Sequence, residues 1–266
     1  MLCFMTTLAS RTIAALRAEH DELAAAVAAL SPADLTGPSG AAEWTVAQVV
    51  SHLGSGAEIT LAEFRGSTGE AAPPAPGFNQ SVWDRWNAMS PADQAAGWLA
   101  ANAELVATLE ALSTDQHDAI KVKFGWLPEP ITLTSFTGLR LNESALHGWD
   151  VRVATDPAAT VADDHAQLLA EHFAGGLSFV FGFLGKAPAS REPAVVAIDG
   201  TPFSIVLDDG VRFATDVPGA TAAFTGRLES AMRLTSGRLT PAHTPPAVTV
   251  TGNITLDELR TAFPGF

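Results

Sequence analysis

The sequence has one cysteine and few basic residues. Cys3 stands close to the first residue, so the chain can form neither an intramolecular disulfide nor a metal site built from cysteines. Such a chain suits a reducing compartment, and we expect it in the cytoplasm. Lys and Arg number 15 against 29 Asp and Glu, which gives a formal net charge of −14. This charge disfavours nucleic acids and anionic membranes as partners.

Long apolar segments are absent as well. No run approaches the roughly 18 apolar residues of a membrane span. The first residues, with Met1 or Met5 as the start, lack the basic segment and the apolar stretch of an export signal. The chain has 266 residues, of which 47% are hydrophobic, so a large core is possible and two domains are expected.

Helical periodicity dominates the first two thirds of the chain. Apolar residues at intervals of three and four predict bundle helices at residues 12–30, 46–64, 91–112 and 133–154, and a fifth at 160–183. Thr45 and Gln48 form a capping box before the second helix, and Ser90 with Pro91 opens the third. A proline-rich segment at 71–77 breaks the chain and leaves Trp83 in a loop. The pattern predicts a helical bundle over residues 1–188, with four core helices plus a fifth.

Beyond Pro188 the sequence changes to short β-type runs. Residues 194–198, 203–207, 211–215, 220–225 and 247–251 predict strands, and residues 228–234 and 256–263 predict helices. We therefore expect a domain boundary near 186–193 and a small α+β domain over residues 189–266. A domain of this size is near the low end for independent folding, so we expect it to dock on the bundle and close a cleft there. The fold class predicted for the whole chain is α+β.

The most informative polar residues lie on the fourth predicted helix. Arg140, Glu143, His147 and Asp150 are spaced three, four and three apart, which places them on one helical face. Glu143 and His147, one turn apart, can grip one divalent ion. The best third ligand is His52, about two turns into the second helix and beside its buried face. Two histidines and one carboxylate leave coordination positions open, as catalytic metal sites do.

The pattern alone leaves other interpretations open. A Glu and a His at i and i+4 are commonly an exposed pair of small energetic value. A lone histidine at the edge of an apolar face, as His52 is, is often a hydrogen-bonded core residue. Asp150 is equally explained as a surface carboxylate near the end of a helix.

Three segments resemble the mycothiol-dependent maleylpyruvate isomerase family of actinobacteria. Residues 44–53 (WTVAQVVSHL) and 140–150 (RLNESALHGWD) are similar to the motifs of its DinB-like metal-binding helical bundle. Residues 224–238 (FTGRLESAMRLTSGR), followed by 248–252 (VTVTG), resemble its small sterol-carrier-like α+β domain. The resemblance implies that His52, Glu143 and His147 hold a divalent metal ion, with zinc expected first.

The resemblance also suggests roles for further residues. Asp150 matches the acid of the family motif, and we expect it to accept the spare N–H of a ligand imidazole and to serve catalysis in that way. Arg238 resembles an arginine that faces the metal cleft, where it would bind a substrate carboxylate and stabilise an enolate. The alternative is that Arg238 only favours a helix dipole. Arg140 is the other basic residue near the site, and we expect it to help hold the thiol cofactor.

The function implied by the resemblance is a thiol-dependent isomerisation. With mycothiol as cosubstrate, a divalent ion would lower the pKa of the thiol, and the thiolate would add to an electrophilic alkene, which rotates before elimination. A substrate with a leaving group would instead undergo S-transfer. Two alternatives stay open, a metal-assisted hydrolase and a non-catalytic carrier or sensor of a small ligand. The expected partners are a small electrophile and a thiol, and the expected assembly is a monomer or homodimer.

Overall fold

The computed structural model describes residues 7–186 and 192–265. The chain divides into two compact units, Met1–Ala159 and Thr160–Phe266, and each is described by itself. The expectations about Cys3 and about a start at Met1 or Met5 fall outside the described residues.

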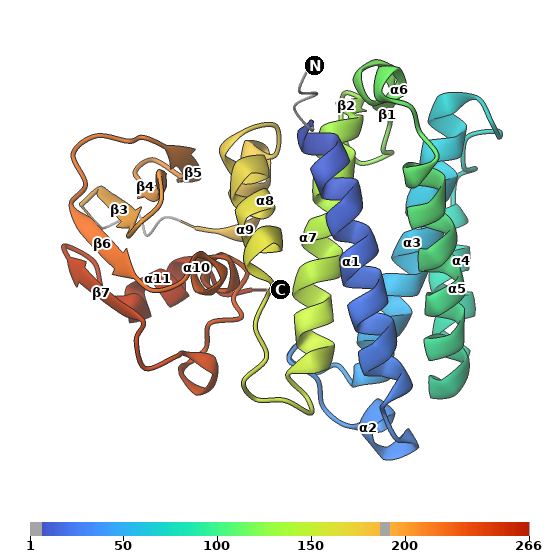
Figure 1. Cartoon of the computed structure of the whole chain (residues 1–266), viewed down its shortest axis with the longest axis horizontal. Coiled ribbons are helices and arrows are strands. Elements are labelled where there is room, and N and C mark those ends of the chain that lie inside the picture. Colours follow the sequence, from blue (N-terminus) through green and yellow to red (C-terminus); the bar gives the residue numbers. More distant parts are fainter. Residues whose placement is uncertain (1–6, 187–191, 266) are drawn as a thin grey trace, which may run out of the picture. The chain divides into compact units, whose positions relative to one another are not determined.

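The first unit is a bundle of four long helices with shorter elements around it (Figure 1). Helix α1 packs on α7 and α5, and α3 packs on α5 and α7, so the four helices close into a ring of neighbours. Their bounds are α1 Leu8–Ala28, α3 Val46–Thr68, α5 Pro91–Glu110 and α7 Leu133–Arg152. The short elements are α2 Pro32–Thr36, α4 Phe78–Asn87, α6 Thr114–Ala119, β1 Lys121–Val122 and β2 Ile131–Thr132. The predicted four-helix bundle is confirmed.

Local capping explains where these helices begin. The Thr45 side chain accepts from the Gln48 backbone N–H, and the Gln48 side chain accepts from the Thr45 N–H, which completes the predicted capping box. Ser90 caps α5 by accepting from the Asp93 N–H, with Pro91 in the first turn. Each cap satisfies backbone donors that the helix itself leaves without partners.

Helix α4 corrects the prediction that Trp83 stands in a loop. The helix begins after Gly77 and carries both Trp83 and Trp86. The Trp86 ring fills a notch above Gly54 of α3, where a Cβ atom would lie only 2.2 Å from the indole. Its Nε1 donates to Glu58 of α3 over 3.0 Å. The helix is too short to be recognised by its periodicity, and the inserted Trp86, the buried Val82 and the ion pair of Arg85 with Glu58 attach it to the bundle.

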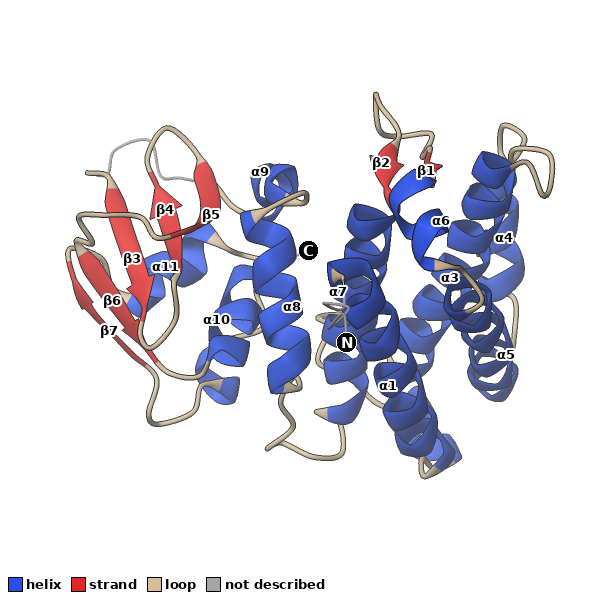
Figure 2. Cartoon of the chain, turned by 45° about the horizontal axis from the view of Figure 1, so that its top comes forward, coloured by secondary structure: helices blue, strands red, loops and turns tan. Residues whose placement is uncertain are grey.

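The second unit is a five-stranded sheet with helices, as the α+β prediction requires (Figure 2). The strand order is β5-β4-β3-β6-β7, with β3 and β6 parallel and the other neighbours antiparallel. The strands are β3 Ala194–Ile198, β4 Phe203–Leu207, β5 Val211–Thr215, β6 Ala222–Thr225 and β7 Thr249–Gly252. The helices are α8 Asp163–Ala174, η1 Ser178–Val180, α9 Phe181–Leu184, α10 Leu228–Thr235, η2 Pro241–His243 and α11 Leu256–Ala262.

The boundary between the units lies earlier than the predicted position near 188. Helix α8 packs on α10 and β5, and the Phe173 and Phe181 rings both contact Phe213 of β5. These apolar contacts join α8 and α9 to the sheet, although the helical periodicity of residues 160–183 predicted a helix of the bundle. The predicted fifth helix at 160–183 is also broken, because Gly175 takes a ψ of −122° at the end of α8, outside the helical region.

Among the helices that the structure describes, none alone combines the length and the apolar composition of a membrane span. The segments Asp163–Ala174 and Ser178–Leu184, which are bent relative to each other, reach the length and apolar composition of a membrane span only when they are taken together.

We predict that Gly54→Ala destabilises the bundle even though alanine is the better helix former. The added methyl group would overlap the Trp86 indole, and overpacking of this kind costs about 1–3 kcal/mol. Urea denaturation followed by circular dichroism measures the change in the free energy of unfolding. Gly97→Ala is the graded control, since its Cβ would lie 3.1 Å from the same ring and should cost less. A Gly54→Ala protein more stable than the wild type would contradict the close packing of the Trp86 indole on Gly54.

Candidate metal centre

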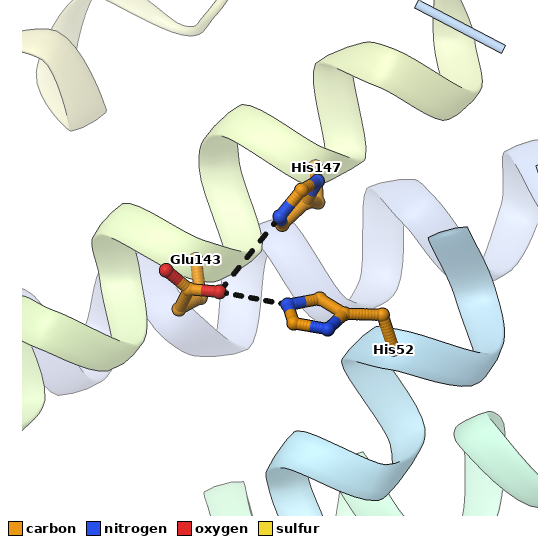
Figure 3. A group of neighbouring side chains, drawn as sticks. All are labelled: His52, Glu143 and His147. Atoms are coloured by element: carbon orange, nitrogen blue, oxygen red, sulfur yellow. Dashed lines mark hydrogen bonds and ion pairs between the residues drawn. The ribbon is translucent and has the colours of Figure 1, made fainter. Parts of the chain in front are cut away.

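The three predicted metal ligands meet at one point between α3 and α7 (Figure 3). The Glu143 Oε2 atom lies 3.0 Å from His52 Nε2 and 3.8 Å from His147 Nε2. All three candidate ligand atoms lie within 4.8 Å of one another. Among the residues that the structure describes, no other group of His, Cys, Asp and Glu meets the same criterion.

Two of the three candidate ligands are brought together by one helix, and the third is brought to them by helix packing. The helical repeat places Glu143 and His147 one turn apart on α7, so the sequence alone brings these two together. His52 is 91 residues from Glu143 in the chain and reaches it only because α3 packs on α7.

The donor set fits a zinc ion. Zinc in proteins binds imidazole nitrogen and carboxylate oxygen at about 2.0–2.2 Å, which in tetrahedral geometry separates neighbouring ligand atoms by roughly 3.3 Å. The observed separations of 3.0 and 3.8 Å lie on either side of that value. The side chains of His52 and Glu143 remain 37% and 43% exposed, so a bound ion would be open to small molecules. Three protein ligands with an open side is the arrangement of a catalytic centre rather than of a closed structural one.

The charge state of Glu143 also suits a ligand. Burial by itself would raise the pKa of Glu143, but the hydrogen bond with His52 and the charges of His147 and Arg140 outweigh it and lower this pKa to about 2. The carboxylate is therefore ionised at neutral pH, the form that binds a metal ion.

Asp150 occupies the position expected for a residue that orients a ligand. It is fully buried, and its Oδ2 lies 2.8 Å from His147 Nδ1. As an ionised carboxylate, Asp150 would accept the Nδ1 proton of His147 and leave Nε2, which lies on the side of Glu143, as the nitrogen that binds a metal ion. The catalytic contribution of Asp150 itself stays a prediction.

Arg140 lies inside the bundle and belongs to a chain of hydrogen bonds. Its Nη2 donates to the Leu53 carbonyl and to Asn102 Oδ1, each over 2.9 Å, and Asn102 Nδ2 lies 2.9 Å from His20 Nδ1. Burial lowers the pKa of Arg140 to about 10, while the nearby Glu143 opposes the shift, so the guanidinium keeps its charge at neutral pH. Its role in holding a thiol cofactor stays a prediction.

Arg238 belongs to the second unit. It follows α10 and Gly237, which has a φ of 75°, and its Nη1 donates to the Ser236 carbonyl over 3.2 Å. The proposed catalytic role of Arg238 likewise stays a prediction.

Two residues of the site were missed in the sequence. Reasoning from the sequence assigned Trp44 no role at the site, yet its ring centroid lies 5.2 Å from that of His52 and 6.0 Å from that of His147. The one signal for it was its place at the start of the family-like segment 44–53. Asn102 could have been noticed as a polar residue four positions after Trp98, on the apolar seam of its helix.

A hollow of the first unit lies away from this centre. It measures about 760 Å³, lies between α3, α4 and α5, and contains none of the three ligands. Its charged side chains pair with one another across helices, as Glu58 with Arg85 and Arg65 with Glu104. The candidate metal ligands thus lie outside this hollow, whose charged side chains are paired with one another.

We predict that Asp150→Asn weakens zinc binding about 10–100-fold, the usual effect of losing a partner that orients a metal ligand. Asparagine keeps the size of the side chain but removes the charge that holds the His147 proton on Nδ1. Competition with a chromophoric chelator measures the affinity. Asp115→Asn, an exposed change on α6, is the control. Equal affinity in Asp150→Asn and the wild type would remove the orienting role.

Comparison with known sequences gives one family model and two curated relatives. Residues 16–152 match the family model described as the mycothiol maleylpyruvate isomerase N-terminal domain. Two uncharacterized proteins of Mycobacterium tuberculosis, from different strains, are 31% identical over 146 residues, which are 52% of this chain and 54% of each relative. The chain thus matches about half the length of these curated relatives.

Solved structures extend the likeness in fold. Crystal structures of the mycothiol-dependent maleylpyruvate isomerase and of a histidine-to-alanine mutant of it align with a TM-score of 0.64 at 14% and 15% identity. Each alignment covers 94% of this chain and 98% of the other. At such identity the likeness concerns the fold alone. The family model, however, spans more than half of the sequence and contains all three candidate ligands. The chain belongs to the mycothiol maleylpyruvate isomerase family.

Proposed function

We propose that this protein is a zinc-dependent enzyme that uses a low-molecular-weight thiol, mycothiol, as cosubstrate for the isomerisation or S-transfer of a small electrophile. The observation that carries the proposal is the convergence of His52, Glu143 and His147 inside the family domain. The name of the similar solved structures, mycothiol-dependent maleylpyruvate isomerase, supports the choice of thiol and of an unsaturated acid as substrate class.

The chemistry follows from an open metal site. A bound divalent ion of this kind lowers the pKa of a thiol and so makes the nucleophilic thiolate available at neutral pH. The residues of the chain would bind and orient this ion, with Glu143 supplying negative charge and Asp150 holding the proton of His147 away from it. Two imidazoles and one carboxylate suit zinc better than the oxygen-preferring magnesium or calcium.

Basic residues would handle the negative charges of the reactants. We propose that Arg140, charged and close to Glu143, favours an anionic thiol cofactor at the site. We also propose that the second unit closes the site and contributes Arg238, whose guanidinium would bind a substrate carboxylate in a bidentate manner. The Arg238 assignment rests on the resemblance of residues 224–238 to the small domain of the family.

We propose that the protein works in the cytoplasm. Low-molecular-weight thiols are kept reduced there, and a chain with one cysteine has no need of an oxidising environment.

A metal-assisted hydrolase is the second candidate. The same exposure that admits a thiol to Glu143 and His52 admits water, and zinc activates water as well as thiols. Turnover of an activated ester or amide with no thiol present would favour the hydrolase. Turnover of maleylpyruvate that requires mycothiol would favour the isomerase.

We predict about one zinc ion per chain in protein purified without a metal-affinity tag, and loss of this zinc in His147→Ala. The substitution removes one of three ligands, and two ligands seldom retain zinc. Elemental analysis measures the content, and thiol-dependent activity should fall with it. His243→Ala, in the second unit, is the control histidine variant. A wild-type protein that holds no metal and binds no added zinc would exclude the metal-dependent enzyme and leave the non-catalytic carrier as the remaining hypothesis.

For Arg238→Ala we expect a fall in kcat/KM of about 10–100-fold, since a charged hydrogen bond contributes roughly 1.5–3 kcal/mol. The zinc content should not change, because the residue is no ligand. Steady-state kinetics with varied electrophile measures the effect. Arg227→Ala, which removes an exposed ion pair with Asp163 in the same unit, is the matched control. Unchanged turnover and substrate affinity in Arg238→Ala would exclude the assignment.

A further inference from the structure

Trp44 adds a third ring to the two imidazoles of the metal centre. Its indole stacks on His147 with an interplanar angle of 17° and a centroid distance of 6.0 Å. It is tilted by 54° to His52 at 5.2 Å, and the two imidazoles meet edge to face at 4.8 Å. The indole therefore contacts both nitrogen ligands at once, while 38% of the residue remains exposed.

The loop that carries Trp44, residues 37–45, is closed by its own hydrogen bonds. The backbone N–H and the hydroxyl of Ser39 both donate to the Trp44 carbonyl, over 3.0 and 2.9 Å. The Val46 N–H donates to the Gly37 carbonyl over 3.1 Å, and Pro38 pairs with Thr45 in an isolated bridge. The backbone of Trp44 is thus fixed relative to the start of α3, the helix of His52.

The same loop is attached to α7. The Gly40 N–H donates to the Asp150 carbonyl over 2.8 Å. A Cβ atom at Gly40 would lie 2.7 Å from Val153 Cγ1 and 2.9 Å from the Asp150 Cα, so only glycine permits this approach. Asp150 therefore anchors the loop through its backbone and holds His147 through its carboxylate.

We propose that Trp44, held by the 37–45 loop, is a positioning residue that fixes the His52 and His147 rings in the orientation that binds zinc. The inference rests on the proposed metal site. Rings that are already oriented lose less side-chain freedom when the ion binds, and this preorganisation raises affinity. A Trp44 that served only as an apolar cover for α3 would affect stability and leave zinc affinity unchanged.

Zinc affinity of Trp44 variants tests the inference. In competition with a chromophoric chelator, Trp44→Ala should bind zinc about 10-fold or more weakly, as expected when a partner that orients a ligand is lost. Trp44→Phe keeps an aromatic ring against the imidazoles and should restore most of the affinity. Trp83→Ala, which removes an indole of similar exposure from α4, should bind zinc like the wild type.

Fluorescence shows whether Trp44 itself responds to the bound ion. Because Trp44 touches both ligands, zinc titration should change tryptophan emission in the wild type and in Trp83→Phe, and this change should be absent in Trp44→Phe. Gly40→Ala should also weaken zinc binding, because the added methyl group would press on Val153 and Asp150 and push the loop off α7.

The outcomes separate this inference from the proposed function. A wild type that binds no zinc overturns both. A wild type that binds zinc, with a folded Trp44→Ala variant that binds it equally well, overturns the role of Trp44 alone. If Trp44→Ala does not fold, the emission change in Trp44→Phe and the affinity of Gly40→Ala decide, and wild-type results in both would overturn the role.

Discussion

The Glu143 carboxylate lies between two imidazoles from different helices, and the candidate site depends on this contact. His52 hydrogen-bonds to it from α3, His147 approaches it from one turn further along α7, and the buried Arg140 supplies a positive charge nearby. These partners stabilise the ionised form of Glu143, whose side chain remains 43% exposed. The arrangement that stabilises Glu143 is also the one that presents three ligands to a single ion.

One chain of hydrogen bonds joins all four core helices behind this site. His20 of α1 meets Asn102 of α5, Asn102 accepts from Arg140 of α7, and Arg140 donates to the Leu53 carbonyl of α3. A buried network whose members are paired specifies how the helices sit against one another, whereas apolar packing alone tolerates sliding. The His52 helix and the Glu143 helix are thus linked by polar contacts on the side of the site that faces the bundle interior.

The comparison with solved structures separates fold from chemistry. At 14–15% identity the chain keeps the fold of the mycothiol-dependent maleylpyruvate isomerase along nearly its whole length, and a fold alone does not determine a reaction. What connects this chain to a metal-dependent mechanism is the set of donor atoms at the centre and the residues that orient them. In the second unit, buried phenylalanines pack α8 and α9 against the sheet. The proposed function assigns this unit a part in catalysis through Arg238.

Local rules in the sequence determined much of this protein. Capping residues at Thr45 and Ser90 set where helices begin, and the i, i+4 spacing on α7 paired Glu143 with His147, because these features depend on neighbours within one helical turn. Only the tertiary structure decided that His52 completes the set, that Trp44 covers both imidazoles, that α4 is a helix and that α8 belongs with the sheet. Each of these depends on contacts between residues far apart in the chain, and helical periodicity shows which face is buried but not what it is buried against.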